Sequence, residues 1–514
     1  MPLYILPEIL TEIFLNAVDT NGITDHDPTV AMSLSMVCST WRSVALSISA
    51  IWARISAYFD FDGEQDFQYP TGVLQRLELH LTRSRSELLE VTLKIASFHE
   101  TQGVTGYLRA PAEVANTINP PELLPLLRAI LSESHRIRML SLPTEDKLSQ
   151  LEALSLLRPF TWKNLHSIDI KVDFDDDDAE AATELVELFG ISNPNLRRIR
   201  FSNTRGHFPT TLSSSFPPSQ ITHLHVGYIL NTTAFHYLSH FPALVSAELG
   251  IWKRINVGYE SDEDVQEPEQ PRLVLPHLRS LSLDLCPGNI HIDGDLNATY
   301  LFHDALTLPS LKNLAYTSKR MVNCKSDGHS ENFVASLSQM LERSNYPVLS
   351  FRLECIPIID SYLVWLLKQL PLLEVFEVRG ADGISILHNI YCDHGFEDDI
   401  FTTTSQLLEA LTLTPTNAQL LPRLRRIILW TRTDWREDCY PFETLLESRM
   451  RGFRPLESAY LHLVDEGPDT KWTFDWRCLK ALQENGMAVK VVQRFSSNGR
   501  PCDDSRAKVL FGYE

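Results

Sequence analysis

The chain has 514 residues, more than one hydrophobic core usually supports, so its length predicts several domains or an array of repeats. An apolar fraction of 44% indicates a globular protein, and a net charge of −20 argues against capture of nucleic acid through its phosphates. Eight scattered cysteines without a CxxC pair predict neither a zinc module nor a disulfide framework. Without a basic leader or an uncharged stretch of spanning length, we expect a protein of the cytoplasm or nucleus that binds proteins, not nucleic acid or membrane.

Residues 3–55 predict three short helices. Apolar residues recur every three or four positions in the first, with Pro7 near its first turn. The second is expected to begin with Asp27 as its N-cap and Pro28 at the first helical position, and the apolar pattern continues to Ile55. A domain of this size buries only about 60% of its unfolded surface, so some of this apolar surface is expected to meet a partner.

This stretch contains several short motifs in a characteristic order and spacing. They are Leu6-Pro7-Glu8-Ile9-Leu10, Ile13-Phe14, Leu34-Ser35-Met36-Val37-Cys38, Trp41-Arg42, Ala45-Leu46 and Ile51-Trp52. In these motifs residues 3–56 resemble the F-box family, specifically the F-box-like proteins abundant in fungi. One departure is the loop at 19–28, which is longer than in the tightest versions of the motif.

The F-box resemblance implies that residues 1–59 dock on the Skp adaptor and through it on a cullin, while the rest of the chain captures a substrate. The adaptor-binding residues that it implies are Leu6, Pro7, Glu8, Ile9, Leu10, Ile13, Phe14, Leu34, Val37, Cys38, Trp41 and Trp52. Leu6, Pro7, Ile9 and Ile13 are expected nearest the adaptor. Two alternatives stay open: the stretch is a helical cap on a repeat array, and its tryptophans serve packing alone.

An acidic stretch at 60–76 predicts a hinge, and a repetitive region of about 12 irregular units follows at 77–495. Each unit carries the hexad apolar-x-x-apolar-x-apolar, whose period-two ending is typical of a strand. The hexads are Leu88/Val91/Leu93, Ile137/Leu140/Leu142, Leu165/Ile168/Ile170, Leu196/Ile199/Phe201, Ile221/Leu224/Val226, Leu244/Ala247/Leu249, Leu278/Leu281/Leu283, Leu311/Leu314/Tyr316, Val348/Phe351/Leu353, Leu373/Phe376/Val378, Leu424/Ile427/Leu429 and Leu456/Ala459/Leu461.

The intervals between hexads hold helix candidates at 122–134, 179–189, 332–343 and 362–370. Six hexads follow a Pro-x-Leu sequence, in which proline is expected to separate each helix from the next strand. The stretches 260–270 and 380–401 interrupt the pattern and predict surface insertions. A helix at 476–485, stopped by Gly486, and a strand at 488–492 predict a cap before a tail at 496–514.

Strand–helix units at this spacing resemble the leucine-rich repeat family, although the Asn or Cys that usually follows the hexad is missing. The two resemblances together imply an α/β fold: a three-helix F-box-like domain followed by an irregular leucine-rich repeat solenoid, a horseshoe with parallel strands on its concave face.

Side chains between the apolar positions of each hexad are expected on the concave face, because side chains alternate along a strand. The expected substrate-binding residues are Arg198, Arg200, His223, His225, Glu248, Arg352, Glu377, Arg379, Trp430 and Tyr460. The same face is expected to hold Asp169, Lys171, Asp284, Glu354 and His462. The first four binding candidates predict a locally positive patch that could accept an acidic or phosphorylated segment. The alternative is a solvated strand face with no specific role.

No sequence motif for catalysis or phosphate binding occurs. His223 and His225 could both face a metal, but two ligands do not complete a site, and the acidic run 173–178 lacks the pattern of a calcium loop. We therefore expect no catalytic residue, metal or cofactor. The predicted function is the substrate-recognition subunit of an SCF-type cullin-RING ubiquitin ligase, which binds a protein target for ubiquitination. The alternative is a non-degradative leucine-rich repeat scaffold.

Overall fold

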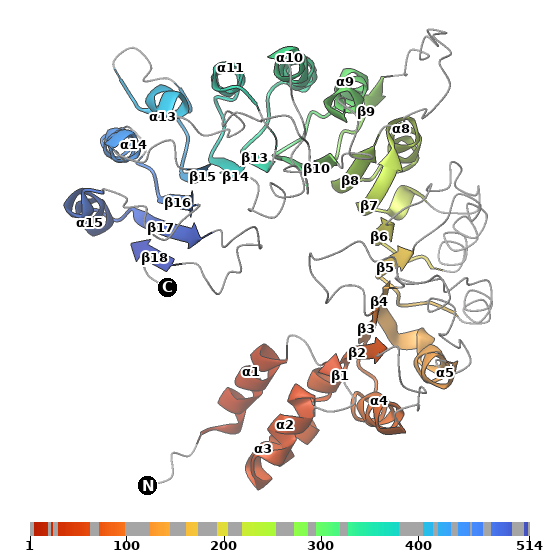
Figure 1. The fold of residues 1–514 in the computed structure, drawn as a ribbon. Helices are drawn as coiled ribbons and strands as arrows, with labels where there is room; N and C mark the ends of the chain where they lie inside the picture. Colours follow the sequence, from red (N-terminus) through yellow and green to blue (C-terminus); the bar gives the residue numbers. More distant parts are fainter. Residues whose placement is uncertain are drawn as a thin grey trace. The chain divides into compact units, whose positions relative to one another are not determined.

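The computed structural model divides into two compact units, Met1–Tyr228 and Ile229–Glu514, which are described separately (Figure 1). It describes residues 5–18, 22–23, 29–61, 71–97, 124–143, 161–172, 193–203, 218–252, 272–285, 295–318, 327–354, 356, 358–379, 405–414, 420–432, 440–452, 455–465, 474–495 and 508–511. The predicted helix at 179–189, the acidic run 173–178 and the insertions 260–270 and 380–401 lie outside these residues.

The first unit begins with a helical head. Its elements are α1 (Pro7–Ala17), α2 (Val30–Met36), α3 (Ser39–Ser47) and the short 3-10 helix η1 (Ser49–Trp52). Pro7 is the first residue of α1, as predicted. The predicted start of the second helix was wrong, because Thr29 rather than Asp27 is the N-cap of α2 and accepts a hydrogen bond from the Met32 backbone. Extended backbone at Cys38 then separates α2 from α3.

A strand follows the head where the apolar pattern had predicted more helix. Ile55 lies in β2 (Arg54–Phe61), which pairs in parallel with β1 (Gly22–Ile23) and β3 (Leu89–Ser97). The expected domain boundary at residue 59 therefore falls inside a strand. The expected hinge at 60–76 overlaps α4 (Thr71–Arg83), because Val73, Leu77 and Leu81 form a buried helical stripe there.

The sheet of the first unit is parallel, with its strands in chain order from β1 to β7. After β3 its elements are α5 (Leu124–Ser132), η5 (Ser134–Arg136), β4 (Ile137–Pro143), β5 (Ser167–Val172), β6 (Arg198–Asn203), η6 (Pro218–Gln220) and β7 (His223–Leu230). Helices α4 and α5 cover the same face of this sheet (Figure 1).

The second unit repeats strand and helix at shorter intervals. Its elements are α8 (Asn231–His240), β8 (Ser246–Trp252), β9 (Leu273–Val274), β10 (Ser280–Leu285), α9 (Asp295–Ala305), β11 (Leu306–Thr307), β12 (Asn313–Thr317), α10 (Asp327–Arg343), β13 (Ser350–Glu354), α11 (Asp360–Lys368), β14 (Val375–Arg379), α13 (Ser405–Leu411), β15 (Arg426–Arg432), α14 (Tyr440–Met450), β16 (Ser458–Asp465), α15 (Trp476–Glu484), β17 (Ala488–Phe495) and β18 (Lys508–Phe511).

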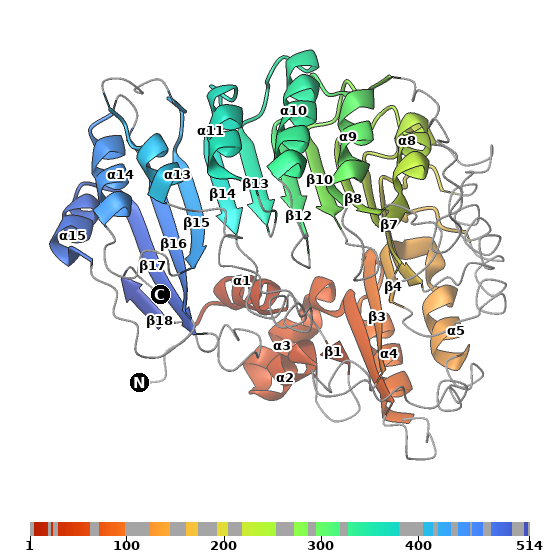
Figure 2. The same cartoon turned by 45° about the horizontal axis from the view of Figure 1, so that its top comes forward.

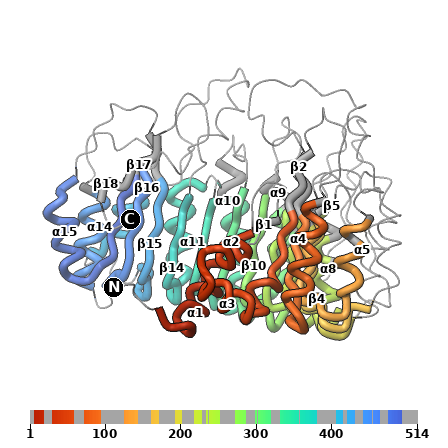
Figure 3. The backbone as a smooth tube through the Cα atoms, turned by 90° about the horizontal axis from the view of Figure 1, so that it is seen from below, coloured from red at the N-terminus to blue at the C-terminus, as the bar shows by residue number. Residues whose placement is uncertain are grey.

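Strands β8, β10 and β12 to β17 form one parallel layer in chain order, which Figure 3 follows from green to blue. Strand β18 adds to β17 in antiparallel orientation, so the expected tail at 496–514 contains a strand. Short strands β9 and β11 form a separate parallel pair. The helices lie side by side on one face of the layer (Figure 2), where each packs on the next.

All twelve hexads lead into a strand, as predicted, and the two later apolar positions point into the core in almost every case. In the first hexad the first buried position is Leu89, one residue later than predicted, whereas Leu88 is 43% exposed. The Pro-x-Leu sequences form turns in which the leucine N–H donates to the carbonyl before the proline, as Leu311 does to Leu308 and Leu373 to Leu370. Proline suits the second position of such a turn. The predicted stop after α15 is also present, since Gly486 has a φ of +93°.

Burial alternates along β10, where three apolar residues face the helices and Ser280, Ser282 and Asp284 face the other side. Each unit is thus an α/β layer structure built on a parallel sheet. The side of each sheet opposite the helices is called the strand face below.

Candidate functional site

The helical head presents more apolar surface than its core covers. Leu10 and Phe14 of α1 are buried, whereas Leu6, Ile9 and Ile13 on the neighbouring face are 54%, 51% and 44% exposed. These three residues, called the apolar stripe, recur at three- and four-residue spacing and so form a line along the helix. Met36 and Val37 add exposed apolar surface at the end of α2, with Val37 61% exposed.

The predicted adaptor-binding residues divide into a surface group and a core group. The exposed ones are Leu6, Pro7, Glu8, Ile9, Ile13, Val37 and Cys38; Leu34 and Trp41 are half-buried; Leu10, Phe14 and Trp52 are buried. The Trp41 ring packs 5.0 Å from that of Phe14. The fully buried Trp52 donates its indole N–H to the Ala45 carbonyl at 2.8 Å. The buried residues form the core of the head, which holds the exposed residues in place.

The head is joined to the sheet through a buried histidine that the sequence analysis missed. His80 of α4 places Nδ1 3.3 Å from the Trp52 carbonyl and Nε2 2.9 Å from the Thr29 hydroxyl. Burial lowers the pKa of His80 to about 4, so its ring is neutral at pH 7. A carbonyl only accepts, so Nδ1 donates to it and Nε2 accepts from Thr29. The Arg83 guanidinium lies 4.4 Å from the Trp52 ring.

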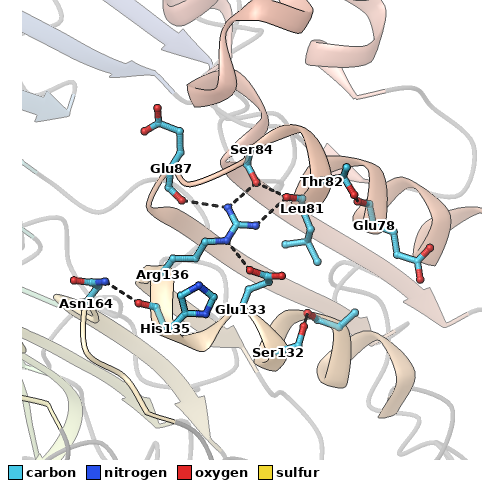
Figure 4. A network of polar contacts seen from close by, with 11 residues as sticks. Glu78, Leu81, Thr82, Ser84, Glu87, Ser132, Glu133, His135, Arg136 and Asn164 are labelled. Carbon is cyan, nitrogen blue, oxygen red and sulfur yellow. Dashed lines mark hydrogen bonds and ion pairs between the residues drawn. The ribbon is translucent and has the colours of Figure 1, made fainter.

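A second polar network fixes α4 to the following repeat. The buried Arg136 donates from Nη2 to the Leu81 carbonyl at 2.9 Å and from Nη1 to the Ser84 hydroxyl at 2.9 Å (Figure 4). Its Nε atom pairs with Glu133 at 2.7 Å, and Nη1 also reaches the Glu87 carbonyl. These bonds satisfy the Leu81 carbonyl near the end of α4 and the Glu87 carbonyl beyond it, so they connect α4 to η5.

The strand face of the first unit brings the predicted basic residues together. Arg198 lies opposite His223, and Arg200 opposite His225, in the register of β6 and β7. The patch is less positive than predicted, however. Arg200 pairs with Asp169 at 3.9 Å, and burial lowers the pKa of His223, helped by the charge of Arg198.

The strand face of the second unit carries a continuous line of charged and aromatic side chains, called the charged-aromatic row. Its members from β13 to β16 are Glu354, Arg352, Glu377, Arg379, Trp430 and His462. Arg352 pairs with Glu354 and lies 4.0 Å from Glu377, which pairs in turn with Arg379.

The aromatic end of the row stacks on its charged end. The Arg379 guanidinium lies 5.7 Å from the Trp430 ring centroid, and the His462 ring stacks on Trp430 at 4.7 Å. Tyr460 lies beside the row, half-buried and in register with Ile428 and Lys490. Five of the predicted binding residues thus fall on four consecutive strands. Glu248, a sixth, is exposed on β8.

In the described part of the chain, no group of three His, Cys, Asp or Glu side chains is placed to hold a metal ion. Among the same residues, no helix has the length and apolar character needed to cross a membrane. No protein-family model matches the chain, and no curated protein matches it.

Proposed function

We propose that this protein is the substrate-recognition subunit of an SCF-type cullin-RING ubiquitin ligase. The helical head is an F-box that binds the Skp adaptor, and the strand–helix repeats are irregular leucine-rich repeats that hold a protein target. The chain supplies proximity rather than catalytic groups, since holding a target beside the transfer machinery removes an entropic cost. Such a protein works in the cytoplasm or nucleus.

The observation that carries the proposal is the exposure of the apolar stripe. Leu6, Ile9 and Ile13 occupy the motif positions expected nearest the adaptor, and each is at least 44% exposed. Contiguous exposed apolar surface on a folded protein marks an interaction site. The buried motif residues support this division, because Leu10 and Phe14 anchor the helix that carries the stripe.

The hydrogen bonds by which His80 connects the head to α4 also support the proposal. A receptor has to hold its target at a fixed position relative to the adaptor. The bonds of His80 to Thr29 and Trp52, and those of Arg136 to α4, connect the head to the first repeats.

A non-degradative scaffold is the second candidate, and the charged-aromatic row favours it equally, because this surface needs no adaptor to bind a protein. The two candidates differ only in the partner of the apolar stripe. Purification of the tagged protein under proteasome inhibition separates them. We expect the Skp adaptor and a cullin to accompany the intact protein, and their absence would leave only the scaffold.

The matched variants are Ile13→Asp and Leu15→Asp. Both replace an exposed apolar residue of α1 by the same acid, but Leu15, 36% exposed, lies on the other side of the helix from the stripe. We expect Ile13→Asp to lose adaptor and cullin with an unchanged melting temperature, and Leu15→Asp to retain both. Retention of the adaptor by a folded Ile13→Asp variant would contradict the proposed docking surface.

A further inference from the structure

The strand face of the second unit has an uneven distribution of charge. At its β8 and β10 end, Glu248 and Asp284 are acidic. On β14 to β17, by contrast, the alternation of the strands places Arg379, Arg426 and Lys490 on this face with a single acid, Glu377, among the described residues. Basic side chains thus gather at one end of the face, on a chain whose net charge is −20.

Two of these cations have no carboxylate partner among the residues that the structure describes. Arg379 pairs with Glu377, whose side chain is 12% exposed. Arg426 is exposed and donates to the Ser458 hydroxyl at 3.2 Å, and Lys490 is half-buried on the next strand but one. Across the described ranges, no carboxylate pairs with Arg426 or Lys490. Positive charge without an internal partner attracts anionic groups of a ligand.

Aromatic groups lie between the cations. Tyr460 is half-buried, and its register neighbours are Ile428 on one side and Lys490 on the other. Trp430 is only 7% exposed, because Arg379 covers one side of its ring and His462 stacks on it. Arginine and aromatic residues in a partly desolvated setting are typical binding anchors.

We propose that the strand face of β14 to β17 binds an acidic segment of another protein, with Arg426 and Lys490 contacting its carboxylates and Tyr460 its apolar side chains. This inference rests on the proposed function and assigns a class to its target. A protein segment fits better than nucleic acid, because base stacking needs a free aromatic face and that of Trp430 is covered. The patch at Arg198 and His223 fits less well, since its histidine is held neutral.

The test selects random 12-residue peptides on the full-length protein and measures the affinity of the best peptide by titration. The variant Arg426→Glu/Lys490→Glu reverses the charge at both positions. The matched control Arg451→Glu/Lys480→Glu makes the same change in charge on α14 and α15, where these side chains are 80% and 72% exposed. A neutral variant, Arg426→Gln/Lys490→Gln, covers the case in which the reversed charges prevent folding.

We expect the selected peptides to be rich in Asp and Glu, and the strand-face reversal to weaken binding at least about tenfold while the control changes it less than about twofold. Peptides without excess acid, or equal weakening by both reversals, would overturn the proposal. Tighter binding of a poly(U) RNA than of any peptide, lost in the strand-face variant, would overturn it in favour of nucleic acid. Adaptor copurification is read separately, so the Ile13→Asp variant should still bind the peptide.

Discussion

The Nε2 atom of His80 lies 2.9 Å from the hydroxyl of Thr29, the N-cap of a helix 51 residues earlier in the chain. The same hydroxyl accepts the Met32 backbone N–H and donates its own proton to Nε2, because the single proton of the neutral ring is on Nδ1. With Nδ1 donating to Trp52, one neutral imidazole connects α2, η1 and α4. One side chain thus joins two elements of the helical head to a helix that packs on the sheet.

Replacing His80 by phenylalanine should destabilise the first unit by about 2 to 4 kcal/mol. The ring volume and the edge contact with Trp52 at 5.0 Å are kept, but the Thr29 hydroxyl and the Trp52 carbonyl lose buried partners. Urea unfolding, followed by hydrogen exchange of α4, measures the change. His135→Phe is the control, because that side chain is exposed and should tolerate the substitution. Equal stability of the two variants would show that the hydrogen bonds of His80 do not stabilise the first unit.

Stability should also fall as the pH drops from about 6.5 to 4. Burial lowers the pKa of His80 to about 4 and that of the fully buried His303 to about 3, whereas an unfolded histidine titrates near 6.5. Within that window these two histidines bind protons in the unfolded chain but not in the folded chain, so protonation favours unfolding.

For His80 the loss amounts to about 3 kcal/mol across the window, and it is complete below pH 4. Urea unfolding at pH 7, 6 and 5 measures the slope. The His80→Phe variant should give a shallower slope in the first unit. If its slope equals that of the unchanged protein, His80 is not held neutral in the folded state.

The sequence predicted the repeats well because each strand has to bury the same two apolar positions. Leu281 and Leu283 are one such pair, and local alternation is enough to find them. It predicted the head less well, because Ile55 continues a helical apolar pattern although it forms a strand. Pairing of β2 with β3, which no local pattern encodes, decides that outcome.

The candidate sites show the same difference between local and distant information. Alternation along strands was enough to place Arg379, Trp430 and Tyr460 on one face. The family resemblance had set Ile13 apart from Phe14 as nearer the adaptor, but the exposure of Ile13 beside the buried Phe14 depends on where α2 and α3 pack. The role of His80 depends on a partner 51 residues away. The spacing of Val73, Leu77 and Leu81 could have predicted its helix, but not its partners.

Two arginines at the end of α14 differ sharply in burial and in hydrogen bonding. Arg449 is 3% exposed and donates to three backbone carbonyls, those of Leu411 and Leu420 and, at 3.0 Å, that of Leu421, whose φ of +48° is strained. Burial lowers its pKa to about 10, so it is still charged at pH 7. Arg451, two residues later, is 80% exposed and pairs with Glu447 at 3.2 Å.

Arg449→Met should destabilise the second unit by about 3 kcal/mol, because three buried carbonyls lose their donors at once. Arg451→Met should leave stability unchanged, since an exposed ion pair on a helix contributes little. Thermal unfolding of the two variants, which remove the same charge from neighbouring positions, measures the difference. Equal melting temperatures would mean that water replaces the guanidinium at these carbonyls. Arg449 lies on the helix side of the layer. Molecules of the Arg449→Met variant that remain folded should therefore bind the peptide on the strand face as before.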